Sequence, residues 1–143
     1  MNFSKQIFRI VFVSTLNLLF VVLSTHASYG ADQSRVYFTV PADKATVSSP
    51  VKVTMGAEHF IVEPAGPVKS GAGHLHIIID ADCIAAGLTV PKDETHLHYG
   101  KGQMEADITL SPGGHTLCLQ AADGAHTALA GKGMTQKITI TVQ

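Results

Sequence analysis

The sequence lacks the motifs and charge patterns that identify several common classes of enzyme and of nucleic-acid-binding protein. It contains no Gly-x-Ser-x-Gly, no glycine-rich phosphate loop and no His-Glu-x-x-His, which argues against the hydrolases, nucleotide-binding enzymes and zinc peptidases that carry them. Its ten basic and eleven acidic residues are interspersed and form no basic stripe, whereas nucleic-acid binding needs clustered Lys and Arg. We therefore expect no nucleic-acid binding, and an enzymatic function is not favoured.

The sequence also lacks an apolar run long enough for a membrane-spanning helix. Residues 10–23 form its main apolar stretch, whereas a spanning helix needs about 20 apolar residues. Lys5 and Arg9 precede this stretch and a cluster of small residues follows it, which is the order found in secretory signal peptides. We predict a signal peptide over residues 1–30, a single domain over residues 31–143, a periplasmic or secreted location and no stable membrane anchor after cleavage. The alternative is an uncleaved N-terminal anchor.

Cysteine is scarce, with only Cys83 and Cys118 in the chain. In an exported protein two cysteines are expected to form a disulfide. The bond would close a loop of about 36 residues, which the chain-entropy model values at roughly 3–4 kcal/mol. The alternative is that a thiolate binds a soft metal such as copper or zinc.

Helical periodicity is absent from the mature region, and alternation of apolar and polar residues dominates it. Ser-Pro-Gly-Gly at 111–114 is a tight turn, which predicts a hairpin between its two flanking strands, and one helical turn is expected at 82–86. The spacing of seven or eight short strands predicts an all-β fold, a small antiparallel β-sandwich. The C-terminal stretch resembles the last strands of bacterial immunoglobulin-like modules. The main expected strands cover residues 35–40, 51–57, 74–80, 96–99, 103–110, 115–122 and 137–142.

Histidine is abundant, with eight in the chain and seven after the predicted signal peptide. Four of them form two His-Leu-His units, at 74–76 and 96–98. Side chains two residues apart in a strand point to the same face, so each unit presents two imidazoles together while Leu75 and Leu97 point to the opposite face. On neighbouring strands, the four imidazoles could converge. The candidate metal ligands are therefore His74, His76, His96 and His98.

Paired imidazoles suit Cu(II) or Zn(II), which take histidine nitrogen at about 2.0–2.1 Å. Asp80 and Glu105 are candidates for orienting the rings from outside the ligand set. His126, in a loop, is either a further ligand or a surface residue. His115 is a weaker candidate ligand, and a partly buried, hydrogen-bonded role is favoured for it. The alternative for all of these histidines is a structural role without metal.

Three segments, Gly-Ala-Gly-His-Leu-His-Ile-Ile-Ile-Asp, His-Leu-His-Tyr-Gly-Lys-Gly-Gln-Met-Glu and Leu-Ser-Pro-Gly-Gly-His-Thr-Leu-Cys-Leu, resemble an uncharacterised family of bacterial exported proteins, domain of unknown function 4399. The resemblance runs from about Gly71 to the C-terminus and implies an exported single domain, but no activity. Relatives carry a further histidine after the position of His126, where this chain has none. The family's motif positions fall on His74, His76, His98, Gly100, Lys101, Gly102, Gln103, Glu105 and His115.

Two functions are compatible with these features. The first is an exported histidine-rich domain that binds one copper or zinc ion through the paired His-Leu-His strands. The second is a non-catalytic immunoglobulin-like module that binds an unidentified envelope protein or polymer, with the histidines in structural roles. The two differ in whether the protein takes up metal.

Overall fold

The computed structural model describes residues 34–143, so the predicted signal peptide lies outside the described residues. No helix within this part of the chain is long and apolar enough to cross a membrane. Its regular elements are strands together with one short 3₁₀ helix, η1 (Lys132–Met134). The strands are β1 (Arg35–Val40), β2 (Ala45–Val47), β3 (Val51–Glu58), β4 (Ile61–Val62), β5 (Ala72–Ile79), β6 (His96–Tyr99), β7 (Glu105–Ile108), β8 (Gly113–Ala122) and β9 (Thr135–Val142).

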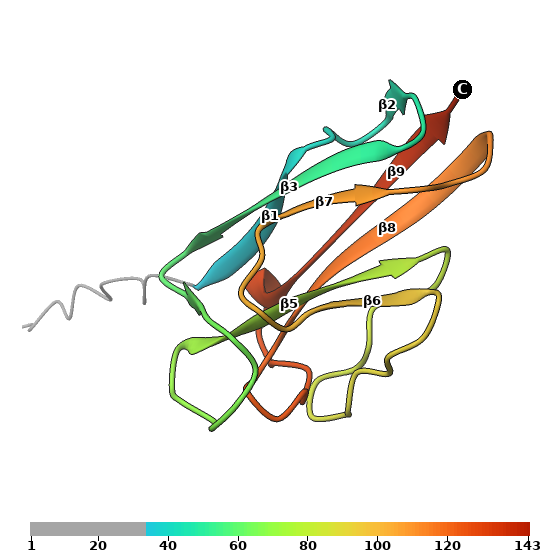
Figure 1. Ribbon diagram of the computed structural model, residues 1–143. Coiled ribbons are helices and arrows are strands. Elements are labelled where there is room, and N and C mark those ends of the chain that lie inside the picture. The colour runs from blue at the N-terminus through green and yellow to red at the C-terminus, as the bar shows by residue number, and fades with distance from the viewer. Residues whose placement is uncertain (1–33) are drawn as a thin grey trace, which may run out of the picture.

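The strands form two sheets that pack face to face as a sandwich (Figure 1). One sheet has the order β1-β3-β7, and the other has the order β2-β9-β8-β5-β4, with β6 also paired to β5. Most pairs are antiparallel, although β2 pairs with β9 and β4 with β5 in parallel. The predicted all-β sandwich is confirmed.

Alternating side chains of both sheets fill the space between them. In β5, Leu75 and Ile77 point into this core and are completely buried. In the facing sheet, Val51, Val53 and Met55 of β3 do the same. Burying a side chain of this size contributes about 1.5–3 kcal/mol. The period-two pattern therefore assigned the inward faces of these two strands correctly.

Two local predictions are wrong. The turn at 111–114 does not close a hairpin, because β7 pairs with β3 in one sheet whereas β8 pairs with β5 and β9 in the other. The turn carries the chain across the sandwich, so the apolar faces of β7 and β8 belong to opposite walls of one core. The expected helical turn at 82–86 is also absent.

Strand β5 is covered on both faces. Its first seven residues are buried, because the segments 80–95 and 123–131 fold over its outer face. Val90 and Ala128 from these segments join Ala122 of β8 in a second, smaller apolar cluster. Cys83 and Cys118 form the predicted disulfide, with their Cα atoms 5.7 Å apart. The bond fastens segment 80–95 to β8 and indicates an oxidising, non-cytoplasmic environment.

Candidate metal centre

The candidate site is built on the outer face of β5 and of the two strands beside it. His76 lies directly opposite His98 of β6 and, on its other side, opposite Gln120 of β8. His74 lies two residues earlier on the same face, opposite Ala122 of β8. The two His-Leu-His units therefore lie on neighbouring strands, the condition on which their convergence depended, and the inward-facing Leu75 and Leu97 pack in or against the main core.

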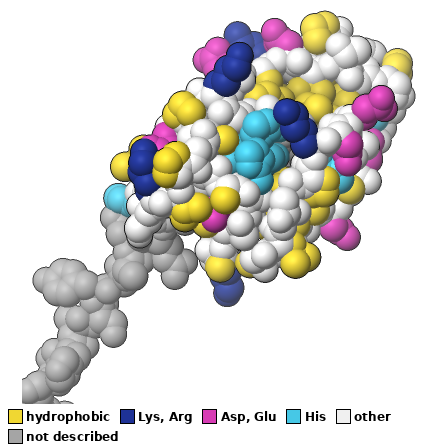
Figure 2. Space-filling model, turned by 60° about the horizontal axis from the view of Figure 1, so that its bottom comes forward, with side chains coloured by type: hydrophobic (Ala, Val, Ile, Leu, Met, Phe, Trp, Pro, Cys, Tyr) yellow, Lys and Arg dark blue, Asp and Glu magenta, His cyan; other side chains and the backbone are white. Residues whose placement is uncertain are grey.

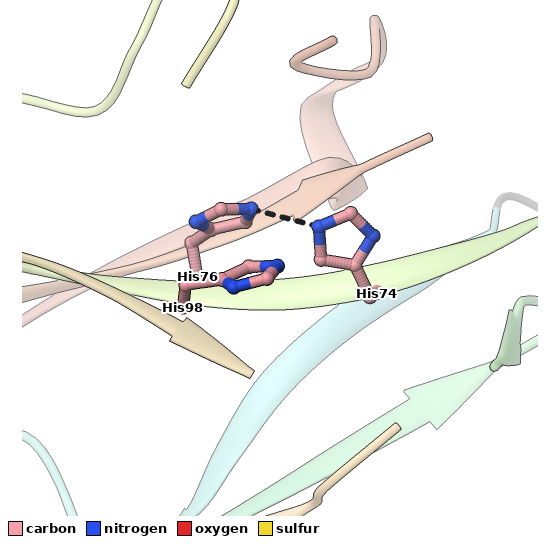
Figure 3. A group of neighbouring side chains, drawn as sticks. All are labelled: His74, His76 and His98. Carbon is pink, nitrogen blue, oxygen red and sulfur yellow. Dashed lines mark hydrogen bonds between the residues drawn. The ribbon is translucent and has the colours of Figure 1, made fainter. Parts of the chain in front are cut away.

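Four imidazoles converge at this place, from β5, β6 and the loop after β8. The Nε2 atoms of His74 and His76 are 3.0 Å apart, as are those of His98 and His126. All six pairs of ring centroids lie between 4.7 and 5.9 Å. One ring nitrogen from each of His74, His76 and His98 lies within 4.8 Å of the other two (Figure 3). We call His74, His76, His98 and His126 the histidine cluster.

His126 reaches the cluster because its loop is held by backbone and carboxylate hydrogen bonds. Asp123 Oδ1 accepts hydrogen bonds from the backbone N–H groups of Ala125 and Thr127, at 2.9 and 2.8 Å. The carbonyl of His126 accepts one from Val90 N at 2.9 Å. His126 has a φ of 69°, a conformation that is uncommon for residues other than glycine. The loop thus directs the imidazole onto the sheet.

The Gly100–Gln103 segment, predicted to be a family motif, forms the turn that follows β6. Gly100 touches the cluster, because a Cβ atom at this position would overlap the ring of His98. Because Gly100 has no side chain, the His98 ring can occupy the space that a Cβ atom would fill. Lys101 N donates to Gln103 Oε1 at 2.8 Å, and Gly102 has a φ of 78°. These three residues shape the turn.

The cluster is buried on the sheet side and open on the loop side. His74 and His76 are completely buried, whereas His98 and His126 are partly exposed. Figure 2 shows histidine side chains at the bottom of a hollow in this end of the molecule, with a basic side chain at its edge. A small ion can therefore approach the imidazoles from solvent without passing through the core.

The environment of the cluster disfavours positive charge on the rings. Burial, with a smaller repulsion from His126 and His98, lowers the pKa of His74 to about 4. Burial and the neighbouring histidines lower the pKa of His76 to about 3. The pKa of His98 is also lowered, by burial first and then by His126 and Lys92. At neutral pH these three rings are uncharged and carry the lone pairs that a metal ion needs.

Four of the predicted residues lie apart from the cluster. Nδ1 of His96 donates to Asp93 Oδ1 at 2.9 Å, and His96 lies two residues before His98 in β6, opposite Ile78. His96 is hydrogen-bonded to a carboxylate, and its ring nitrogens are not among those that converge. Glu105 is exposed on the opposite sheet, in β7. Asp80, expected to orient the cluster, instead accepts a hydrogen bond from His115 Nδ1 at 2.7 Å. The preferred prediction for His115, a hydrogen-bonded and partly buried side chain, agrees with this contact.

The sequence pattern left two roles open for His126, ligand or surface residue, and it predicted no role for Gln120. His126 lies four residues beyond the end of β8, where alternation gives no information. Gln120 is completely buried and faces the cluster. Its position two residues after the buried Cys118, on the same strand face, was the one available signal. Among the described residues, the structure thus brings together His74, His76, His98 and His126, with Gln120 beside them.

The arrangement presents imidazole nitrogens from three separate segments to one small volume. Neutral imidazole is a common ligand for zinc, copper, iron and nickel in proteins. Three nearby histidines can therefore hold a metal ion, and these three are among the four ligands expected from the sequence.

The chain matches no curated protein and no solved structure. The family described as "Domain of unknown function (DUF4399)" matches residues 53–143, a range that contains every member of the histidine cluster. The match covers more than half of the chain and agrees with the resemblance carried by the His-Leu-His and Pro-Gly-Gly-His segments. The chain therefore belongs to the domain of unknown function 4399 family.

Proposed function

We propose that this protein is an exported domain that binds one transition-metal ion, copper or zinc, through His74, His76 and His98, with His126 as a fourth ligand. The observation that carries the proposal is the convergence of ring nitrogens from the first three residues within 4.8 Å. His96, one of the four ligands expected from the sequence, is replaced in this proposal by His126. The ring nitrogens of His96 are not among those that converge, whereas the ring of His126 lies against the other three rings of the cluster.

The distances between nitrogen atoms support this choice. Two nitrogen ligands at about 2.0–2.1 Å from one ion lie about 2.9 Å apart in a square arrangement and about 3.3 Å apart in a tetrahedral one. The two Nε2 pairs of the cluster are each separated by 3.0 Å. An ion can therefore replace each Nε2–Nε2 hydrogen bond with little movement of the rings.

The proposed location is the periplasm or the outside of the cell. The Cys83–Cys118 disulfide supports a compartment outside the cytoplasm. The charged, apolar and small-residue segments within residues 1–30 follow the order of a secretory signal peptide. In such a compartment the cluster would take its ion after export.

The test is calorimetric titration of the untagged, chelator-treated protein with Cu(II) and with Zn(II). We expect saturable binding of about one ion per chain and loss of this binding in the double variant His74→Ala, His76→Ala. His115→Ala is the matched control, because it removes a histidine of the same sheet that is hydrogen-bonded to Asp80. Unchanged affinity in the double variant would refute the metal site. Binding of a partner that survives chelation would favour the non-catalytic module.

A further inference from the structure

A buried glutamine, Gln120, lies beside the histidine cluster, and the proposed metal ligands do not explain its presence there. Among residues 34–143, three buried side-chain atoms have no hydrogen-bond partner: His74 Nδ1, His76 Nδ1 and Gln120 Oε1. Leaving one such group unpaired costs about 1–3 kcal/mol. All three belong to residues of one face of β5 and β8, so the unpaired polar groups are concentrated at the candidate site.

Gln120 is placed to act on His76. The two residues are directly opposite in the β5–β8 pair, and the Cβ atoms of such a pair are about 4.5–5.5 Å apart. Gln120 Nε2 donates to the carbonyl of Ala121 at 3.3 Å. The amide is therefore held by its nitrogen end, while its oxygen has no donor.

Metal binding changes which nitrogen of each ring carries the proton. In the metal-free pair, the 3.0 Å contact between His74 Nε2 and His76 Nε2 requires a proton on one of these atoms. A metal ion needs the lone pair of both. Both neutral rings must then carry their proton on Nδ1, and each Nδ1–H becomes a buried donor that needs an acceptor.

We propose that Gln120 is a positioning residue of the metal site, whose Oε1 accepts the Nδ1–H of His76 when Nε2 of that ring holds the ion. This inference rests on the metal-binding function proposed above. Hydrogen bonds of this kind fix the tautomer and orientation of a ligating histidine and increase its basicity. Gln120 acts through His76 and is not itself a ligand. One oxygen without a donor and one nitrogen without an acceptor thus become partners on loading.

The test compares Gln120→Leu, which removes the acceptor at similar size, with the wild-type protein. We expect the affinity for Zn(II) to fall about 10–100-fold with the stoichiometry unchanged. Gln120→Glu keeps an acceptor and should bring the affinity back to within a few-fold of wild type. In the metal-free protein, Gln120→Leu removes an unpaired buried oxygen, so its urea midpoint should stay the same or rise. A merely structural glutamine would instead lower this midpoint when replaced.

Gln136→Leu is the matched control. Gln136 lies in β9, and its Oε1 accepts a hydrogen bond from Phe38 N at 2.6 Å. Its replacement should lower the urea midpoint of the metal-free protein and leave Zn(II) affinity unchanged, the reverse of Gln120→Leu. In ¹⁵N spectra of the zinc-loaded wild type, the Nδ1 proton of His76 should exchange slowly, and it should exchange faster in Gln120→Leu.

The outcomes separate the two proposals. A wild-type protein that binds neither Cu(II) nor Zn(II) overturns the proposed function and the role of Gln120 together. A wild-type protein that binds zinc, with a Gln120→Leu variant of equal affinity, overturns only the role of Gln120. Loss of affinity in both Gln120→Leu and Gln120→Glu also overturns it, because an acceptor at this position would then be insufficient.

Discussion

The two ends of the β5–β8 strand pair carry histidines in opposite surroundings. At the end of β5, each ring nitrogen of His115 faces an acceptor: Nδ1 lies 2.7 Å from Asp80 Oδ2, and Nε2 lies 2.9 Å from the carbonyl oxygen of Ser111. At its beginning, His74 and His76 contact each other, and each leaves Nδ1 without a partner. One histidine is fully satisfied by the protein, whereas the other two are not.

The pKa values follow this difference. The hydrogen bond to Asp80, followed by the one to Ser111, raises the pKa of His115, while burial lowers the pKa of His74 and His76. A histidine with an acceptor for each nitrogen is accounted for by structure alone. Buried histidines with unpaired nitrogens reduce the stability of the metal-free fold, which favours a functional reason for their presence. The contrast therefore distinguishes a structural histidine from candidate ligands without reference to sequence motifs.

At neutral pH, removing the disulfide should have the largest effect, and the effect should fall on the end of the sheet that carries the histidine cluster. In the variant Cys83→Ala, Cys118→Ala we expect a loss of about 3–4 kcal/mol of unfolding free energy, measured by urea denaturation. Segment 80–95 supplies Val90, whose N–H binds the carbonyl of His126, so NMR signals of His126 should broaden or shift. Those of His115 should change little. A loss below about 1 kcal/mol would show that the segment is held mainly by its apolar and backbone contacts.

Acid should destabilise the metal-free protein through the cluster. Because the pKa values of His74 and His76 are about 4 and 3 in the folded state and about 6.5 when unfolded, the unfolded chain binds more protons below pH 6.5. Stability should therefore fall as pH falls from 6.5, by up to about 1.4 kcal/mol per pH unit for each histidine. In the double variant His74→Gln, His76→Gln, the unfolding free energy, measured by urea denaturation at several values between pH 5 and 7, should change less steeply with pH. Equal slopes would argue that these rings are protonated in the fold.

The Asp80–His115 contact should have the smallest effect, with the opposite pH dependence. A raised pKa of His115 stabilises the fold below pH 6.5 and ceases to do so as pH rises through the folded value. Asp80→Asn retains an acceptor for Thr116 N, which binds Asp80 Oδ1 at 2.8 Å, but loses the charge. We expect a cost of about 0.2–1 kcal/mol at pH 6 that disappears near pH 9. A cost that is constant across this range would assign the effect to packing.

Much of the fold was predictable from local pattern. Alternation in 74–80 and 51–57 identified two central strands and their inward faces, and the predicted export led us to expect the pairing of Cys83 with Cys118. Pattern could not show which sheet a strand joins, so the turn at 111–114 was read as a hairpin although it crosses the sandwich. Sheet membership depends on contacts between residues far apart in sequence.

The candidate site was also predictable only in part, because some of its residues are placed by contacts between distant parts of the chain. Two residues of one strand, His74 and His76, were assigned to a shared face because strand geometry is local. His126 lies in the cluster because its loop is held by a hydrogen bond from Val90 N, whereas the ring nitrogens of His96 are not among those that converge. The contact between Val90 and His126 joins segments far apart in the sequence, so it has no local signature. Gln120 was missed because a buried glutamine in a strand becomes informative only when the donors around it are known.

Strand β5 is hydrogen-bonded along both edges, to β8 on one side and to β4 and β6 on the other, and its first seven residues are buried. Amides in such a strand exchange with solvent only when the whole domain opens. His74 and His76 therefore stand on the segment that stays folded longest, whereas His126 stands on a loop. The backbone that carries His74 and His76 therefore stays in place for as long as the domain is folded. His126, on its loop, is the ligand that can leave the cluster and return while the domain remains folded.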